Sequence, residues 1–303
     1  MKNEGSSILI KRFATAFLVV CASASAILAQ NAAPAEESAL LYKISGKNLA
    51  KPSYIFGTIH LICPKDMFPA DVLKGYLNQT SQLILELDLS DPAIVAAIVK
   101  GSTLPDGKSV KDSMKPEQYA KIDTMFKSYL GISYDLVQTM KPSLVSAMLF
   151  RSPKVVGCQG ATAYDTFLAD AATAAKMPIS GLETVEDELA AVDSQPLDKQ
   201  IEDLVKVADD PEKTFNSFKE LYSAYIKQDS KGLYKTTIVD GEMDKAMKTK
   251  LLTDRNAVWL PLIEQNISSR PTFIGMGAAH LGGDDGVLHL LKKKGYKITP
   301  IRL

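Results

Sequence analysis

The chain has 303 residues, of which 46% are hydrophobic, and its 35 basic and 35 acidic side chains give a formal net charge of zero. This length is enough for one large domain with a substantial core, or for two small ones. The charge balance gives no electrostatic reason to expect nucleic acid as a partner.

The first 29 residues have the order of a secretory signal peptide. Lys11 and Arg12 precede an apolar, small-residue stretch, Phe13–Ala29. This stretch is too short and too rich in alanine for a convincing membrane span. We expect cleavage after Ala29, with Ala26 as the second choice, and a periplasmic or secreted product. Residues 30–38 are then a spacer, and 39–303 form the folded domain.

Neither lipidation nor a second membrane segment is expected. Cys21 follows Val20, where a lipoprotein signal needs a small residue, and most of the apolar stretch lies after the cysteine. No later segment approaches membrane-spanning length. The mature chain should therefore have no transmembrane segment.

Strands are predicted near both ends of the mature chain. Leu41–Ile44 and Ser53–His60 flank a turn-like tract, which favours a hairpin. The run Leu83–Leu89 alternates with period two, so that Glu86 and Asp88 would project from one face of a strand. A final strand is expected over Tyr296–Leu303.

The middle of the chain, from about residue 110 to residue 266, has a helical pattern. Pro116 and Glu117 suit a first helical turn, and apolar residues recur at three and four spacing over 161–176 and 196–226. Residues 177–184 interrupt this region as a strand entering a helix that Thr184 caps. Residues 286–294 suit a last helix, with Gly295 as its stop. The expected class is α/β (α+β), with strands from the two ends and a helix-rich middle.

Two distant stretches share one chemical pattern, an apolar run followed by Gly-x-x-His-Leu. They contain Gly57 with His60, and Gly277 with His280. Each run predicts a buried strand, whose carboxyl end is where open α/β sheets bind ligands. A single histidine in such a place is more often a packed residue than a ligand, but the repetition favours a shared site. The third histidine, His289, falls in a helical pattern and is interpreted as structural.

Two imidazoles and one carboxylate are a sufficient ligand set for a catalytic transition metal. His60, Glu86 and His280 are the candidate metal ligands. Asp88 is a candidate to orient a histidine or to act as a base. Because these residues are far apart in sequence, only the fold can bring them together.

Five motifs, which occur in order along the mature chain, resemble the TraB/GumN family, which includes the Tiki-type metalloproteases. They are Gly57-Thr58-Ile59-His60, Leu85-Glu86-Leu87-Asp88, Gly181-Leu182-Glu183-Thr184, Arg255-Asn256 with Trp259, and Gly277-Ala278-Ala279-His280-Leu281-Gly282 followed by Gly286. The resemblance implies a fold similar to erythromycin esterase and the haem-binding protein ChaN. It also implies a peptidase-like site with a divalent transition metal, manganese or cobalt ahead of zinc or iron.

The resemblance assigns His60, Glu86 and His280 to the metal. Arg255 falls on a position suited to polarising a carbonyl or holding a carboxylate, because a guanidinium offers fixed, permanently charged donors. Its alternative is an ordinary helix-surface arginine. Glu183 or Asp88 is the candidate proton acceptor, although Glu183 could equally be an acid favoured at a helix start.

The predicted function is an exported metal-dependent hydrolase that acts on a peptide or a small-molecule substrate through a metal-activated water. The alternative is a non-catalytic haem- or metal-binding protein of the same fold. A third possibility is that the histidines merely pack. Removal of the signal peptide leaves two cysteines, Cys63 and Cys158. In an oxidising compartment we expect them to form a disulfide, the alternative being two free buried thiols.

Overall fold

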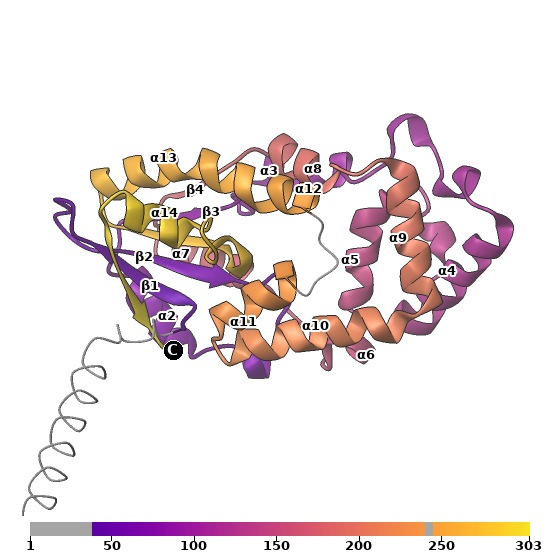
Figure 1. The fold of residues 1–303 in the computed structure, drawn as a ribbon, viewed down its shortest axis with the longest axis horizontal. Helices are drawn as coiled ribbons and strands as arrows, with labels where there is room; N and C mark the ends of the chain where they lie inside the picture. The colour runs from indigo at the N-terminus through magenta and orange to yellow at the C-terminus, as the bar shows by residue number, and fades with distance from the viewer. Residues whose placement is uncertain (1–37, 240–244) are drawn as a thin grey trace, which may run out of the picture. The chain divides into compact units, whose positions relative to one another are not determined.

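The structure is a computed structural model that describes residues 38–239 and 245–303 (Figure 1). The predicted signal peptide, its cleavage site and the spacer up to residue 37 lie outside the described residues. The strands are β1 (Leu41–Ser45), β2 (Ser53–Thr58), β3 (Gln82–Leu85), β4 (Ile179–Gly181), β5 (Thr272–Gly277) and β6 (Lys297–Ile301).

Helices fill most of the remaining described chain. The α-helices are α2 (Ala70–Leu77), α3 (Pro92–Gly101), α4 (Pro116–Leu130), α5 (Pro142–Phe150), α6 (Pro153–Val156), α7 (Tyr164–Ala174), α8 (Val185–Val192), α9 (Leu197–Asp209), α10 (Pro211–Ile226), α11 (Ser230–Tyr234), α12 (Lys245–Lys248), α13 (Asp254–Ser269) and α14 (Val287–Lys293). The 3₁₀ turns are η1 (Pro64–Asp66), η2 (Pro105–Gly107), η3 (Val110–Ser113), η4 (Tyr134–Leu136) and η7 (Ala278–His280). The π-helical turns are η5 (Lys235–Val239) and η6 (Thr249–Thr253).

The strands form one mixed sheet in the order β4-β3-β5-β2-β1-β6. Strands β4, β3, β5 and β2 are mutually parallel, whereas β1 pairs antiparallel with both β2 and β6. The predicted hairpin of β1 and β2 is confirmed, as are the closing helix and strand. The carboxyl ends of four parallel strands therefore meet along one edge of the sheet, where α/β proteins place ligands.

Apolar side chains cover both faces of the sheet. On one face, α2 and α7 pack against Phe56, Leu85 and Phe273. On the other face, α13 and α14 pack against Ile55, Ile84 and Ile274 (Figure 1). All of β2 is buried because helices lie on both of its sides, which explains its continuous apolar run rather than an alternating one.

The helix-rich middle forms a third core of its own. Helices α4, α5 and α9 pack together (Figure 1) around buried residues such as Phe126, Tyr134 and Leu149. The predicted cap of α8 is confirmed, since the Thr184 hydroxyl and the Asp187 carboxylate form a reciprocal capping box. The helical pattern over 196–226 is two helices, because Asp210 leaves the helical conformation ahead of Pro211 and caps α10.

The predicted strand over Leu83–Leu89 is wrong beyond Leu85. The amides of Leu182 and Glu183 bond to the Glu86 carbonyl, where pairing with the β4 segment ends. A turn follows, and Asp91 caps α3 through the Ala93 amide. Glu86 and Asp88 therefore do not share a strand face, although Glu86 still follows directly on a parallel strand.

Candidate metal and hydrolytic site

Candidate site residues follow the ends of the four parallel strands. His60 comes two residues after β2, Glu86 directly after β3, Glu183 two residues after β4, and His280 three residues after β5. Strands β2 and β5 are adjacent and parallel, with Thr58 paired to Gly277. The two Gly-x-x-His stretches therefore lie side by side, which explains how residues 220 positions apart reach one edge.

His60 is held by an acid on α7. Its Nδ1 lies 3.0 Å from Asp165 Oδ2, and the Thr58 hydroxyl donates to Asp165 Oδ1 at 2.9 Å. Asp165 is 5% exposed, whereas the His60 side chain is 69% exposed. The hydrogen bond that His60 donates to Asp165 raises the pKa of His60 to about 9, although partial desolvation of the ring opposes this shift. Since a carboxylate only accepts, Nδ1 carries a proton and Nε2 faces away from Asp165.

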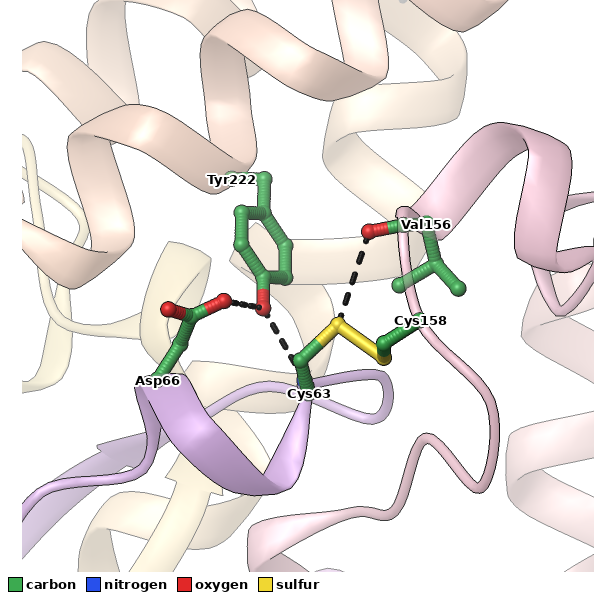
Figure 2. Close-up of a disulfide and its surroundings, with 5 residues drawn as sticks. All are labelled: Cys63, Asp66, Val156, Cys158 and Tyr222. Carbon is green, nitrogen blue, oxygen red and sulfur yellow. Dashed lines mark hydrogen bonds between the residues drawn. A yellow bond between two sulfur atoms is a disulfide. The ribbon is translucent and has the colours of Figure 1, made fainter.

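A disulfide fastens the segment after His60 to the segment that leads into α7. Cys63 and Cys158 are bonded, with their Cα atoms 5.9 Å apart (Figure 2), which confirms the predicted pairing. Beside it, Ile62 and Thr162 exchange backbone hydrogen bonds of 2.8 and 2.9 Å. The chain then enters α7 with Asp165 in its first turn. The covalent link and the bridge together set Asp165 beside His60.

Tyr222 on α10 packs at the disulfide. Its hydroxyl accepts from the Cys63 amide at 2.9 Å and donates to Asp66 at 2.8 Å (Figure 2). The Cys63 sulfur also lies 3.5 Å from the Val156 carbonyl oxygen. These contacts join η1, α6 and α10 around the link, so the loop that carries His60 is held by three helical elements.

His280 is buried and held by α13. Its Nδ1 lies 2.7 Å from Asn256 Oδ1, and the Asn256 amide nitrogen donates to the Asp285 carbonyl at 2.9 Å. Because that arrangement makes Oδ1 the acceptor, His280 is protonated at Nδ1 and has a lone pair on Nε2. Burial lowers the pKa of His280 to about 4, so the ring is neutral at pH 7. The Trp259 ring lies 4.5 Å from the imidazole, measured between centroids.

Glu86 is an ionised carboxylate in a buried position. One oxygen accepts from the Gly277 amide at 2.6 Å, and the other accepts from Arg255 Nη2 at 2.8 Å. Burial favours the neutral acid, but His280, Arg255 and the amide outweigh burial and lower the pKa of Glu86 to about 2. Its Oε1 lies 3.9 Å from His280 Nε2.

Arg255 is the hub of the site and not a surface arginine. Its Nε and Nη2 bond both oxygens of Glu183 at 3.0 and 2.5 Å, and its Nη1 lies 3.3 Å from His280 Nε2. The guanidinium carbon also stacks 4.6 Å above the Trp259 ring. A bidentate, stacked geometry of this kind is specific to arginine. Both Glu183 oxygens are thereby bonded to Arg255. Burial raises the pKa of Glu183, although Arg255 acts to lower it.

Asp88 is the one predicted site residue that the structure does not bring to this cluster. Its carboxylate accepts from the Ser90 amide at 3.1 Å and from the Ser90 hydroxyl at 2.5 Å. It belongs to the turn that precedes α3. The prediction that Glu86 and Asp88 project from the same strand face is wrong, because β3 ends at Leu85.

A cavity of about 230 Å³ opens beside the histidine on β2, and we call it the site cavity. Its lining includes His60, Glu86, Asp165 and, from α8, Glu188. Burial and the neighbouring Glu86 raise the pKa of Glu188. Within residues 38–239 and 245–303 the Glu188 carboxylate has no hydrogen-bond partner. Sequence reasoning missed both Asp165 and Glu188, since first-turn helix acids give no signal of their own.

The donor set matches what a divalent transition metal accepts. Both histidines have Nδ1 held by an oxygen acceptor, which is the usual outer support of a ligating imidazole, and Glu86 is ionised. Across the described residues, however, no three His, Cys, Asp or Glu side chains already surround one point. The Arg255 guanidinium lies against both Glu86 and His280. It therefore occupies space next to the point where a cation bound by both residues would lie.

The structure is a mixed α/β protein in which two histidines and a buried glutamate form a candidate site at the carboxyl edge of the sheet. The TraB/PrgY/gumN family model matches residues 40–300, and the chain belongs to that family.

Curated relatives carry a metalloprotease name. The chain is 22% identical over 302 residues to "Metalloprotease TIKI1" of Homo sapiens, and 23% identical over 300 residues to that of Xenopus tropicalis. Each match covers 82% of this chain and 59% of the relative, so the chain spans about three-fifths of their length. A shorter match to the Danio rerio protein is 32% identical over 75 residues, 24% of this chain and 15% of the relative. No solved structure matches the chain significantly.

Proposed function

We propose that this chain is an exported metal-dependent hydrolase with a peptidase-like site. The observation that carries the proposal is the matched support of His60 and His280, each with Nδ1 on an oxygen acceptor beside the buried, ionised Glu86. The relatives named metalloproteases support the reaction class.

His60, Glu86 and His280 would hold a divalent transition metal, with manganese or cobalt ahead of zinc or iron. Such an ion, when bound, lowers the pKa of a bound water and polarises a carbonyl. His280 is already neutral, whereas His60 must release a proton to bind a cation. The buried Glu86 contributes the negative charge.

Arg255 is proposed to steady the negative charge that develops on the substrate carbonyl. A guanidinium held in advance by Glu183 needs little rearrangement for this role. Glu183 is then a positioning residue for Arg255. It is poorly placed as a base, because both of its oxygens are already engaged.

Proton transfer is assigned to Glu188 in place of Glu183 or Asp88. Its carboxylate lines the same cavity as His60 and Glu86. A raised pKa suits a group that takes up and returns a proton near neutral pH. Glu188→Gln keeps the shape of the side chain and should lower kcat by about 10²–10⁴-fold while metal content is retained.

The deciding experiment combines metal analysis with a peptide-library cleavage assay in the presence of Mn²⁺ or Co²⁺. We expect stoichiometric metal and defined cleavage products from the wild type, and neither from Glu86→Ala. A haem absorbance band without cleavage would contradict the hydrolase and favour a haem-binding protein. If the purified protein has no metal, no haem and no turnover, the two histidines have only a packing role.

Export is the remaining part of the proposal. The disulfide between Cys63 and Cys158 fits an oxidising compartment. Among residues 38–239 and 245–303, no helix is long and apolar enough to cross a bilayer. Mass analysis of the native protein should find an amino terminus near Gln30, and an intact Met1 would contradict export with cleavage.

A further inference from the structure

A second and larger cavity, of about 600 Å³, lies on the other side of α8, and we call it the α8–α13 cavity. Leu189 and Val192 on α8 line the site cavity, whereas Ala190 and Ala191 line the larger one. The helix therefore separates the two cavities with opposite faces, as the spacing of these residues on a helix requires.

The α8–α13 cavity reaches the candidate catalytic cluster directly. Glu183 and Arg255 are part of its lining, and Arg255 also bonds Glu86, which lines the site cavity. A molecule in the larger cavity would thus contact Arg255, the residue proposed to steady the reacting carbonyl, from the side away from Glu86. Arg255 therefore links the lining of the larger cavity to the lining of the site cavity.

The charged groups of the lining already have partners. Lys250 bonds Asp254 at 2.9 Å, Arg255 bonds Glu183, and Asp187 accepts from the Thr184 hydroxyl at 2.7 Å. A charged ligand group would have to compete with these contacts. The lining therefore gives no electrostatic reason to bind a charged side chain.

Most of the uncharged lining left for a ligand is apolar, and Ser194 and Gln195 add two uncharged polar side chains. Val258 is the exposed apolar side chain of the lining, the buried Leu182 and Trp259 lie behind it, and two alanines on α8 leave the space open. Val258 is 62% exposed, which is high for a valine beside a cavity. The volume falls within the range of pockets that bind drug-sized ligands, so it suits a group of about dipeptide size.

We propose that the α8–α13 cavity binds uncharged apolar side chains of a peptide substrate whose scissile bond lies in the site cavity. This inference rests on the proposed function and adds a substrate preference to it. Burial of leucine-sized side chains would supply the binding free energy, and the Arg255 hub would connect that binding to the reacting carbonyl.

Trp259, the only tryptophan of the chain, reports on this cavity without any need for turnover. The test is a fluorescence titration of the metal-free mature protein with N-acetyl-Leu-Leu-amide. We expect a saturable change, and binding at least tenfold weaker for N-acetyl-Gly-Gly-amide and N-acetyl-Asp-Asp-amide. No saturable change, or equal affinity for the three peptides, would overturn the proposal, as would binding of n-octanol without binding of the leucine peptide.

Ala190→Leu fills the cavity from an exposed helix position. It should weaken binding of the leucine peptide at least fivefold. The matched control is Ala120→Leu, an exposed alanine on α4, which should change nothing. Val258→Glu, also at an exposed position, should weaken the leucine peptide by a similar factor. Equal affinity in wild type and both cavity variants would overturn the proposal.

Failure of this inference and failure of the proposed function are distinguishable. Binding of the leucine peptide without metal-dependent cleavage would remove the hydrolase and with it the substrate assignment. The second measurement is kcat/KM for the leucine peptide divided by kcat/KM for the glycine peptide. If this ratio is the same in wild type and Ala190→Leu, the cavity does not bind the substrate, although the protein is still a hydrolase. In an active enzyme we expect that ratio to fall at least fivefold in Ala190→Leu.

Discussion

His60 and His280 share a sequence motif but lie in opposite environments. His60 is exposed beside the buried acid Asp165, which raises its pKa to about 9. His280 is 4% exposed and accepts from Arg255, and burial lowers its pKa to about 4. The repeated motif therefore gives one ring that is protonated at neutral pH and one that is not. A metal that binds both must displace the proton from His60 alone.

The first prediction concerns the metal ligands. His60→Ala, Glu86→Ala and His280→Ala should each weaken Mn²⁺ or Co²⁺ binding by more than the roughly 10–100-fold expected for outer-shell changes, since each removes a donor. Titration calorimetry on folded protein would measure the effect. His289→Ala, on α14, is the control and should bind as the wild type does. Unchanged affinity in any of the three variants would remove that residue from the ligand set.

The second prediction concerns the support of His60. Asp165→Asn keeps the size of the side chain but removes the charge that favours the imidazolium, so the pKa of His60 should fall from about 9 toward the ordinary histidine value of 6.5. Nuclear magnetic resonance of the ring protons in metal-free protein can follow this titration, because the chain has only three histidines. A titration that stays near 9 would mean that Asp165 is not the cause. Thr58→Val removes a donor to Asp165 without changing the net charge, and it should shift the pKa of His60 by less.

At the level of elements, the paired strands could be predicted from sequence and the acids around them could not. Apolar runs that end in Gly-x-x-His indicated β2 and β5, because a strand buried on both faces needs an uninterrupted apolar sequence. The alternation over Leu83–Leu89 predicted too long a strand. Leu87 is buried although it lies beyond β3, so the period-two pattern reflected burial of the turn as well as pairing.

Arg255 and Glu188 show two other limits of sequence reasoning. Only the family motif indicates a role for Arg255, since nothing in its local sequence distinguishes a buried arginine that holds two acids from a surface arginine. Glu188 lies in an acidic first turn of α8, where Glu186, Asp187 and Glu188 are all favoured by the helix dipole. Only the packing of α8 decides which of the three faces the site cavity.

The third prediction tests the contact between the two motifs. A Cβ atom added at Gly57 would lie 2.8 Å from Leu281 Cδ1 and 3.0 Å from Ala278 Cα, so the backbone of η7 would have to move. Gly57→Ala should destabilise the protein by about 1–3 kcal/mol through overpacking, and it should weaken metal binding by displacing His280. Chemical denaturation and calorimetry would measure the two effects.

Gly75→Ala is the matched control for that change. Nothing lies within 4 Å of a Cβ atom at Gly75, which is exposed on α2. Alanine is favoured over glycine in a helix by about 1 kcal/mol, so this variant should be as stable as the wild type or more so. If both glycine variants behaved alike, the close packing of the two motifs would not explain the glycine at position 57.

At the scale of the whole molecule, the four parallel strands and the disulfide perform separate tasks. The strands bring His60, Glu86, Glu183 and His280 to one edge from segments more than two hundred residues apart. The link between Cys63 and Cys158 attaches the helix-rich middle to the segment beside His60. Asp165 and Glu188 both come from that middle region. The candidate site is therefore complete only when the helical region is folded against the sheet.

The last prediction is a loss of stability in acid that depends on His280. The pKa of His280 is about 4 in the folded protein and near 6.5 in the unfolded chain. Between these values the unfolded chain binds a proton that the folded protein does not, so stability is lost as pH falls from 6.5 to 4. The contribution is on the order of 3 kcal/mol. Glu86 acts in the same direction at lower pH, from 4.5 to about 2. His60 acts oppositely, since its raised pKa stabilises fully below 6.5 and that stability is lost as pH rises to about 9.

Urea unfolding of metal-free protein between pH 7 and pH 4, followed by Trp259 fluorescence, would measure this loss. His280→Gln has no imidazole to titrate, so its free energy of unfolding should fall less over that interval, by an amount on the order of 3 kcal/mol. His289→Gln, outside the site, should follow the wild-type profile. If His280→Gln lost as much stability in acid as the wild type, the imidazole of His280 would not be held neutral by burial, and its readiness to bind a cation at neutral pH would lose its physical basis.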